Sequence, residues 1–147
     1  MVFLLAILVP LVSLTLKTLF SQPRPKKFFM DNEIFENLNV IEGIALHTAN
    51  TSFPSGHTIS AFAVMGFAAF TFSKFKWTSF IFIGLAIAVA LSRVYLVQHF
   101  LLDVCVGAGL GCMIAWCASW ASIQVQDPEK IWLESNLLTM KKSKIRT

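Results

Sequence analysis

Two ionisable residues at the start of the last apolar stretch of the chain have a spacing that could support nucleophilic chemistry. His99 and Asp103 lie four positions apart, so on a helix they share one face and the carboxylate can reach an imidazole nitrogen. An acid in that position fixes the tautomer of the histidine and raises its nucleophilicity. The same spacing also suits a purely structural hydrogen bond, so the pair by itself leaves both interpretations open.

A second group, Pro54-Ser55-Gly56-His57, directly precedes another apolar stretch. If that stretch is helical, the amides around Ser55 and Gly56 lie at a helix N-terminus, where unpaired N–H groups and the helix dipole favour an anion. Glycine lets the backbone approach an oxyanion closely, and His57 is placed to donate a proton to a leaving group. The structural alternative is that Ser55 is an N-cap and Pro54 a turn residue.

Three basic residues complete the set: Lys17, Arg24 and Arg93. Guanidinium groups match phosphate oxygens, whereas lysine acts as a point charge. Snorkelling to the bilayer surface would explain Lys17 or Arg93 singly. An up-and-down bundle brings these segment ends to one face, where three cations, two histidines and a carboxylate would meet. Snorkelling does not explain such a set, so it predicts a phosphate site. The sequence has no Cys/His cluster or paired carboxylates at metal-ligand spacing, and we therefore expect chemistry without a metal or other cofactor.

The elements that must position these residues are membrane helices. The chain has 147 residues, of which 56% are hydrophobic and only 14% charged. Its mean hydropathy of +0.69 is too high for a soluble domain of this size. The longest charge-free stretch near the C-terminus, residues 104–126, has 23 residues. It would form about 35 Å of helix, against a hydrocarbon core of about 30 Å.

Lipid forces backbone hydrogen bonds to close within each segment, so the expected fold class is all-α, a polytopic membrane helix bundle. Four transmembrane helices are expected, at about residues 2–20, 57–73, 77–97 and 100–123. Together they make a membrane-embedded domain over residues 1–123, and residues 124–147 follow as a basic tail. Two small-xxx-small pairs indicate close helix packing. They are Gly107 with Gly111 and Gly84 with Ala88.

A long loop, residues 21–56, joins the first two expected helices and would carry part of the site. Within it, apolar residues recur at helical spacing, and acidic residues stand where they favour a helix start. The apolar residues are Ile34, Leu38, Ile41 and Ala45, and the acidic ones are Asp31 and Glu33. We expect a short amphipathic helix on the bilayer surface that covers the end of the bundle, with a substrate-gating lid as the alternative role.

Basic residues outside the expected helices indicate the orientation, because the more positive side faces the cytoplasm. The short loop holds Lys74 and Lys76, and the tail holds Lys130, Lys141, Lys142, Lys144 and Arg146. The long loop instead sets two lysines beside four acids. We therefore expect an integral protein of the bacterial inner (plasma) membrane, with its site facing the periplasm or exterior and its C-terminus in the cytoplasm.

A cleaved signal peptide and a nucleic-acid partner are both disfavoured. The first apolar stretch has no basic leader before it, so we expect a retained helix rather than a cleaved signal peptide. The formal charge of +4 does not indicate nucleic-acid binding, because the basic residues lie at segment ends and in the tail rather than on one soluble face. The expected partners are the bilayer and a lipid substrate.

The order and spacing of these residues resemble the type-2 phosphatidic-acid phosphatase superfamily, a family of membrane lipid phosphatases related to acid phosphatases and vanadium haloperoxidases. The resemblance covers about residues 1–123 and has three parts. The first motif is matched by Lys17, six residues and Arg24-Pro25; the second by Pro54-Ser55-Gly56-His57; the third by Ser92-Arg93, five residues, His99, three residues and Asp103.

The resemblance implies a role for each residue. His99 would attack phosphorus to give a phosphohistidine, Asp103 would orient His99, and His57 would protonate the leaving oxygen. The phosphoryl oxygens would be held by Lys17, Arg24, Arg93, the Ser55 hydroxyl and the Gly56 amide. Water would then cleave the phosphoenzyme without a metal. The implied substrate is a lipid phosphate or diphosphate, such as phosphatidic acid, phosphatidylglycerol phosphate or a polyprenyl diphosphate.

Membrane members of this family usually have six spans, and this chain begins at what would be the third. The expected bundle is therefore the core of the six-helix fold, and a homodimer formed through its exposed face is one expectation. Three alternatives stay open: an inactive or truncated remnant with a structural or partner role, a lipid phosphotransferase in which a hydroxyl replaces water, and an ion pathway. The last is disfavoured because the middle of every span is uncharged.

Overall fold

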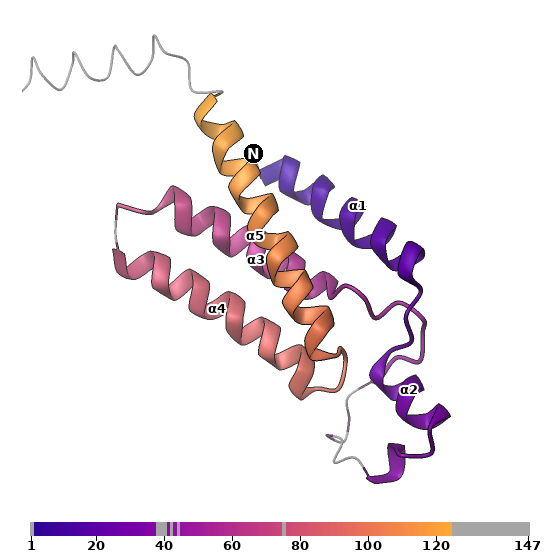
Figure 1. Ribbon diagram of the computed structural model, residues 1–147. Helices are drawn as coiled ribbons and strands as arrows, with labels where there is room; N and C mark the ends of the chain where they lie inside the picture. Colours follow the sequence, from indigo (N-terminus) through magenta and orange to yellow (C-terminus); the bar gives the residue numbers. More distant parts are fainter. Residues whose placement is uncertain (1, 38–40, 42, 44, 75, 125–147) are drawn as a thin grey trace, which may run out of the picture.

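The computed structural model describes residues 2–37, 41, 43, 45–74 and 76–124. In chain order its elements are α1 (Val2–Phe20), α2 (Pro25–Asp31), the 3-10 helix η1 (Phe35–Asn37), α3 (Gly56–Thr71), α4 (Lys76–Tyr95) and α5 (Leu101–Gln124). The described residues contain helices and no strand (Figure 1), which confirms the all-α fold class. All but the first residue of the expected tail lies outside the described residues.

Three of the helices are long and apolar enough to cross a membrane: α1, α4 and α5. They have 19, 20 and 24 residues, or about 29–36 Å at about 1.5 Å per residue. The fourth bundle helix, α3, is apolar but has only 16 residues, or about 24 Å. It ends at Thr71, two residues before the expected boundary, because Phe72 closes its last turn. The protein is therefore an integral membrane protein with one helix shorter than the bilayer core.

α3 is the central helix and contacts α1, α4 and α5 (Figure 1). Its contact with α5 depends on glycine: a Cβ at Gly107 would lie 2.9 Å from the Ser55 carbonyl oxygen, and a Cβ at Gly111 would lie 2.7 Å from that of Ile59. Side chains at these two positions would force the helices apart. The predicted packing role of this pair is confirmed.

The second predicted packing pair, on α4, is wrong. Gly84 and Ala88 are exposed, and a Cβ at Gly84 would meet nothing within 4 Å. The buried small residues of α4 are Ala86 and Ala90, which have the same four-residue spacing. The four-residue spacing of small residues was predicted correctly. Which face of α4 packs depends on the position of α4 against α3, and the sequence does not show that position.

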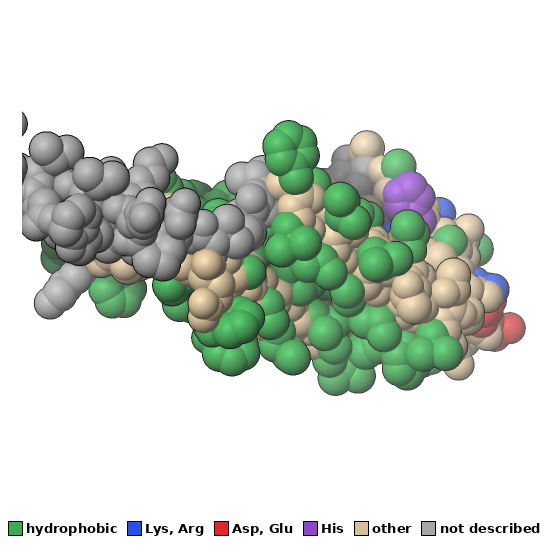
Figure 2. All heavy atoms as spheres, turned by 90° about the horizontal axis from the view of Figure 1, so that it is seen from above, with side chains coloured by type: hydrophobic (Ala, Val, Ile, Leu, Met, Phe, Trp, Pro, Cys, Tyr) green, Lys and Arg blue, Asp and Glu red, His purple; other side chains and the backbone are tan. Residues whose placement is uncertain are grey.

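Large apolar side chains cover the outside of the bundle rather than its centre, as expected for a surface in lipid. Phe3, Trp77, Phe80 and Trp116 are each more than 60% exposed. Figure 2 shows hydrophobic side chains along the described part of the bundle and charged and histidine side chains gathered at one end. That end carries α2 and the long loop.

The predicted loop helix over Ile34 to Ala45 is wrong as far as the structure describes it. The short helix of the loop is α2, which starts with Pro25 at its first position, where a fixed φ and a missing N–H cost nothing. Asp31 ends that helix instead of starting one, and Glu33 has a φ of +58°, which interrupts a helical path. Only the single 3-10 turn η1 follows; Leu38 lies outside the described residues, and Ile41 and Ala45 are not helical.

The position of α2 has a tertiary cause. Phe28 and Phe29 both make ring contacts with Phe100, at centroid distances of 5.6 and 6.2 Å. These contacts hold α2 against the residue that precedes α5. Sequence periodicity cannot detect them, because the partners are about 70 positions apart.

Candidate active site

The site lies where the end of α1, the start of α3 and the start of α5 meet. His99 Nδ1 is 3.4 Å from Asp103 Oδ2, and both residues are buried, with 3% and 1% of their surfaces exposed. The expected contact is present, but its geometry differs from the expected one. His99 lies in the connection before α5, which begins at Leu101, so the two residues do not share a helix face.

The Asp103 carboxylate is held by three donors on the same oxygen. Besides His99, the backbone N–H of Phe100 donates to Oδ2 at 3.0 Å, and the Ser52 hydroxyl donates to it at 2.5 Å. Charge-assisted hydrogen bonds of this kind are the strong ones. They fix the carboxylate, and through it the His99 ring, at the bundle end.

Ser52 is fully buried and was missed by sequence reasoning. Its backbone N–H donates to the Gln22 carbonyl at 3.0 Å, so the two ends of the long loop lie side by side. The only signal available in the sequence was a hydroxyl residue shortly before the Pro54-Ser55-Gly56-His57 group.

Ser55 is the N-cap residue of α3, but its side chain does not cap the helix. Its backbone N–H donates to the Asp103 carbonyl at 3.0 Å, so this amide is not free for an anion as expected. Its hydroxyl is buried and accepts a hydrogen bond from Thr58 Oγ1 at 2.9 Å. Gly56 is the first residue of α3, and helix geometry leaves its N–H without a partner inside the helix.

Lys17, in the last turn of α1, reaches the start of α3. A Cβ at Gly56 would lie 3.6 Å from Lys17 Nζ and 2.9 Å from Ser13 Oγ, so glycine lets the ammonium group approach the helix end. A cavity of about 330 Å³ is lined here by Lys17, Gly56 and His57 among others. His57 is exposed and borders this space, which gives the ring access to a ligand.

Arg24 is oriented by Gln98, the residue before His99. Arg24 Nη1 donates to Gln98 Oε1 at 3.3 Å, and Gln98 Nε2 donates to the Ala45 carbonyl at 3.0 Å. Arg24 Nε is buried and has no hydrogen-bond partner in the described part of the chain. A buried donor without an acceptor is costly, so Arg24 Nε would gain from an acceptor brought to it. Gln98 carried no signal in the sequence beyond its place beside His99.

Arg93 organises the connection that carries His99. Its carbonyl oxygen accepts the N–H groups of Gln98 at 3.0 Å and His99 at 3.3 Å. Its side-chain Nε donates to Ser92 Oγ at 3.2 Å.

Electrostatic interactions join the three cations to His57. Arg93, Lys17 and Arg24 all lie close enough to His57 for their charges to act on its ring. The charge of Asp103 acts in turn on Lys17 and Arg24. All eight predicted site residues therefore gather at one end of the bundle, although Ser55, His99 and Asp103 are enclosed by protein. Among the described residues, no three His, Cys, Asp or Glu side chains form a group that could hold a metal ion.

Comparisons with known proteins identify the family of the chain. The model of the PAP2 superfamily matches residues 1–127. The chain is 38% identical over 88 residues to the bacitracin transport permease protein BcrC of Bacillus licheniformis, covering 60% of this chain and 42% of that protein. It is 38% identical over 77 residues to phosphatidylglycerophosphatase B of Bacillus subtilis, covering 47% of this chain and 38% of that protein.

The matched region is thus less than half the length of either curated relative. No solved structure matches the chain at a significant level. The family model, in contrast, covers all five α-helices and all three motif groups. The chain therefore belongs to the PAP2 superfamily, as its motifs predicted.

Proposed function

We propose that the chain is a lipid phosphatase that removes phosphate from a lipid phosphate or diphosphate through a phosphohistidine on His99. The observation that carries the proposal is the buried His99–Asp103 pair, with its 3.4 Å contact. His99 lies close enough to His57 to interact with it electrostatically, and His57 and Lys17 line a cavity. Nδ1 is the nitrogen that faces Asp103, so Nε2 is the one available to attack phosphorus. The carboxylate stabilises the imidazolium that forms.

The first step forms a bond between His99 Nε2 and phosphorus and breaks the bond between phosphorus and the lipid oxygen. His57 gives its proton to that oxygen as it leaves. Positive charge close to His57 comes from Lys17, Arg24 and Arg93. It stabilises the negative charge that builds on the equatorial phosphoryl oxygens. The unpaired Arg24 Nε and the Gly56 amide are further donors for those oxygens.

The second step returns the enzyme to its starting state. Water attacks phosphorus, His57 takes a proton from the water, and the bond between phosphorus and Nε2 breaks. The products are orthophosphate and free His99. The three charge-assisted donors on Asp103 are the reason that the ring keeps one orientation through both steps.

The lipid nature of the substrate is supported by the position of the site and by the relatives. The charged residues lie at the end of a bundle whose outer surface is apolar (Figure 2), so a head group can meet the cations while its chains stay in lipid. One relative is named for phosphatidylglycerophosphate. The proposed substrates are therefore phosphatidylglycerol phosphate, phosphatidic acid or a polyprenyl diphosphate.

The proposed location is the bacterial plasma membrane, with the site facing outward. The connection between α3 and α4, which holds Lys74, lies at the end of the bundle opposite to the connection between α4 and α5 (Figure 1). Because positive connections favour the cytoplasmic side, His99 is proposed to face the exterior.

Phosphate release by purified protein in detergent, with EDTA present, tests the proposal. The substrates are phosphatidic acid, phosphatidylglycerol phosphate and a polyprenyl diphosphate. His99→Ala is compared with His47→Ala, a matched change at an exposed loop residue outside the site. We expect release with wild type and His47→Ala but none with His99→Ala, and a labelled phosphoenzyme that is stable in alkali and labile in acid. Equal release by His99→Ala would refute the phosphohistidine, and no release by folded wild type would favour the inactive-remnant alternative.

A further inference from the structure

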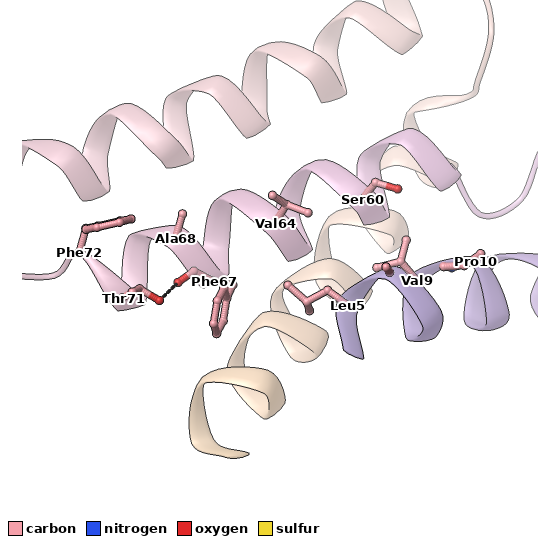
Figure 3. Close-up of a pocket in the computed structure, with 10 residues that line it drawn as sticks. Leu5, Val9, Pro10, Ser60, Val64, Phe67, Ala68, Thr71 and Phe72 are labelled. Atoms are coloured by element: carbon pink, nitrogen blue, oxygen red, sulfur yellow. Dashed lines mark hydrogen bonds between the residues drawn. The ribbon is translucent and has the colours of Figure 1, made fainter. Parts of the chain in front are cut away.

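An apolar groove runs between α1 and α3, away from the site. It has a volume of about 550 Å³. Its lining includes Ser60, Val64 and Ala68, which follow one another along α3, and Phe72, which caps the end of that helix (Figure 3). We propose that this groove, defined here as the α1–α3 groove, binds one hydrocarbon chain of the lipid substrate. The inference rests on the proposed function, because it assigns the chain-binding part of that same site.

The groove adjoins the cavity at the site. Val9, Pro10 and Ser60 line both spaces. The cavity reaches Lys17 and His57 at one end, and the groove reaches Leu5 on α1 and Phe72 just after α3 at the other. A molecule that occupies both would place a charged group among the cations and an apolar chain along α3.

The polar atoms of the groove are already paired. The Ser60 hydroxyl donates to the Gly56 carbonyl at 2.9 Å, and the Thr71 hydroxyl donates to the Phe67 carbonyl at 2.8 Å, the second of which is drawn in Figure 3. Both hydroxyls thus turn back onto their own helix. The groove therefore offers a hydrocarbon surface over its whole length, which suits an acyl or prenyl chain.

The dimensions favour a chain over a helix. From Ser60 to Phe72 the groove follows α3 for about 18 Å at about 1.5 Å per residue, close to the roughly 15 Å of one leaflet of hydrocarbon. A volume of about 550 Å³ over that length gives a mean cross-section of about 30 Å². A helix about 10–12 Å wide has a cross-section of about 80–110 Å². A helix of that width would not fit within the groove, whereas one extended chain would.

Substrate chain length provides the first test. Ala68→Trp fills the groove, and Ala88→Trp makes the same change on the exposed face of α4. The readout is the ratio of kcat/KM for a long-chain phosphatidic acid to that for a short-chain, water-soluble one. We expect this ratio to fall at least tenfold in Ala68→Trp, through a higher KM for the long-chain lipid, and to stay at the wild-type value in Ala88→Trp. An unchanged ratio in folded Ala68→Trp would overturn the inference.

A binding measurement separates this inference from the proposed chemistry. A phosphatidic acid with a photoreactive group in its acyl chain is cross-linked to wild type and His99→Ala, and the labelled residues are mapped by mass spectrometry. We expect labels on Val64, Phe67 and Ala68 in both proteins. Labels confined to outward residues such as Trp116, or between two copies of the chain, would overturn the groove assignment. Labels in the groove without any phosphate release would support the groove assignment and contradict the proposed phosphatase activity.

Discussion

The hydroxyl of Ser52 donates a 2.5 Å hydrogen bond to Oδ2 of Asp103, across 51 positions of sequence. Both residues are fully enclosed by protein. The long loop is therefore part of the structure that orients His99, and not only a connection between helices.

Removing this bond should slow the reaction without dismantling the site. A hydrogen bond to a charged group contributes about 1.5–3 kcal/mol, and each 1.36 kcal/mol lost from the transition state is about tenfold in rate. We expect Ser52→Ala to lower kcat about 10–100-fold with little change in KM. Ser73→Ala, at an exposed residue on the opposite end of the bundle, is the matched control. A kcat for Ser52→Ala within twofold of wild type would show that the bond does not support His99.

The role of His57 as a proton donor makes the effect of its loss depend on the leaving group. General acid catalysis contributes about 10²–10⁴-fold, and a leaving group that departs as a stable anion needs none of it. We expect His57→Gln to lose about 100-fold or more on a lipid phosphate and less than about tenfold on nitrophenyl phosphate. Steady-state rates on both substrates measure this. Equal losses on the two would mean that His57 binds phosphate rather than donating a proton.

Arg24 should depend on the planar shape of its guanidinium group. Its Nη1 is held by Gln98 at 3.3 Å while its buried Nε lacks a protein partner. A lysine keeps the charge but cannot make both contacts. We expect Arg24→Lys to weaken competitive inhibition by inorganic phosphate about tenfold. Lys27→Ala, which removes an exposed bond to Asn50, should leave inhibition unchanged, and an equal inhibition constant for Arg24→Lys and wild type would contradict the assignment.

The close contact of α3 and α5 should make one glycine far more sensitive than its neighbour. A Cβ at Gly111 would lie 2.6 Å from Phe62 Cβ and 2.7 Å from the Ile59 carbonyl oxygen, whereas a Cβ at Gly109 would meet nothing within 4 Å. Overpacking of this kind costs about 1–3 kcal/mol, and alanine otherwise favours a helix over glycine by about 1 kcal/mol. We expect Gly111→Ala to lower the midpoint of thermal unfolding in detergent and Gly109→Ala to leave or raise it. A lower midpoint for Gly109→Ala than for Gly111→Ala would mean that α5 packs on α3 through the face that carries Gly109.

The helices, and the gathering of the candidate site residues at one end of the bundle, were predictable because local rules decide them. Charge-free stretches of bilayer length must close their own hydrogen bonds, so the expected boundaries of α1 and α5 differ from those in the structure by one residue at most. The types and spacing of Lys17, His57, His99 and Asp103 indicated phosphate chemistry. These conclusions depend on residues near one another in sequence and on the solvent around them.

The tertiary structure alone decided how those residues are held. Ser52 and Gln98 act through partners about 50 to 70 positions away, and no periodicity marks such pairs. The Ser55 amide bonds Asp103 instead of an anion, and α4 packs through Ala86 and Ala90 rather than Gly84 and Ala88. The physical reason is common to all of them. The spacing of residues within an element determines which of them share a face. A face, a donor or a groove has a partner only when distant segments of the chain pack together.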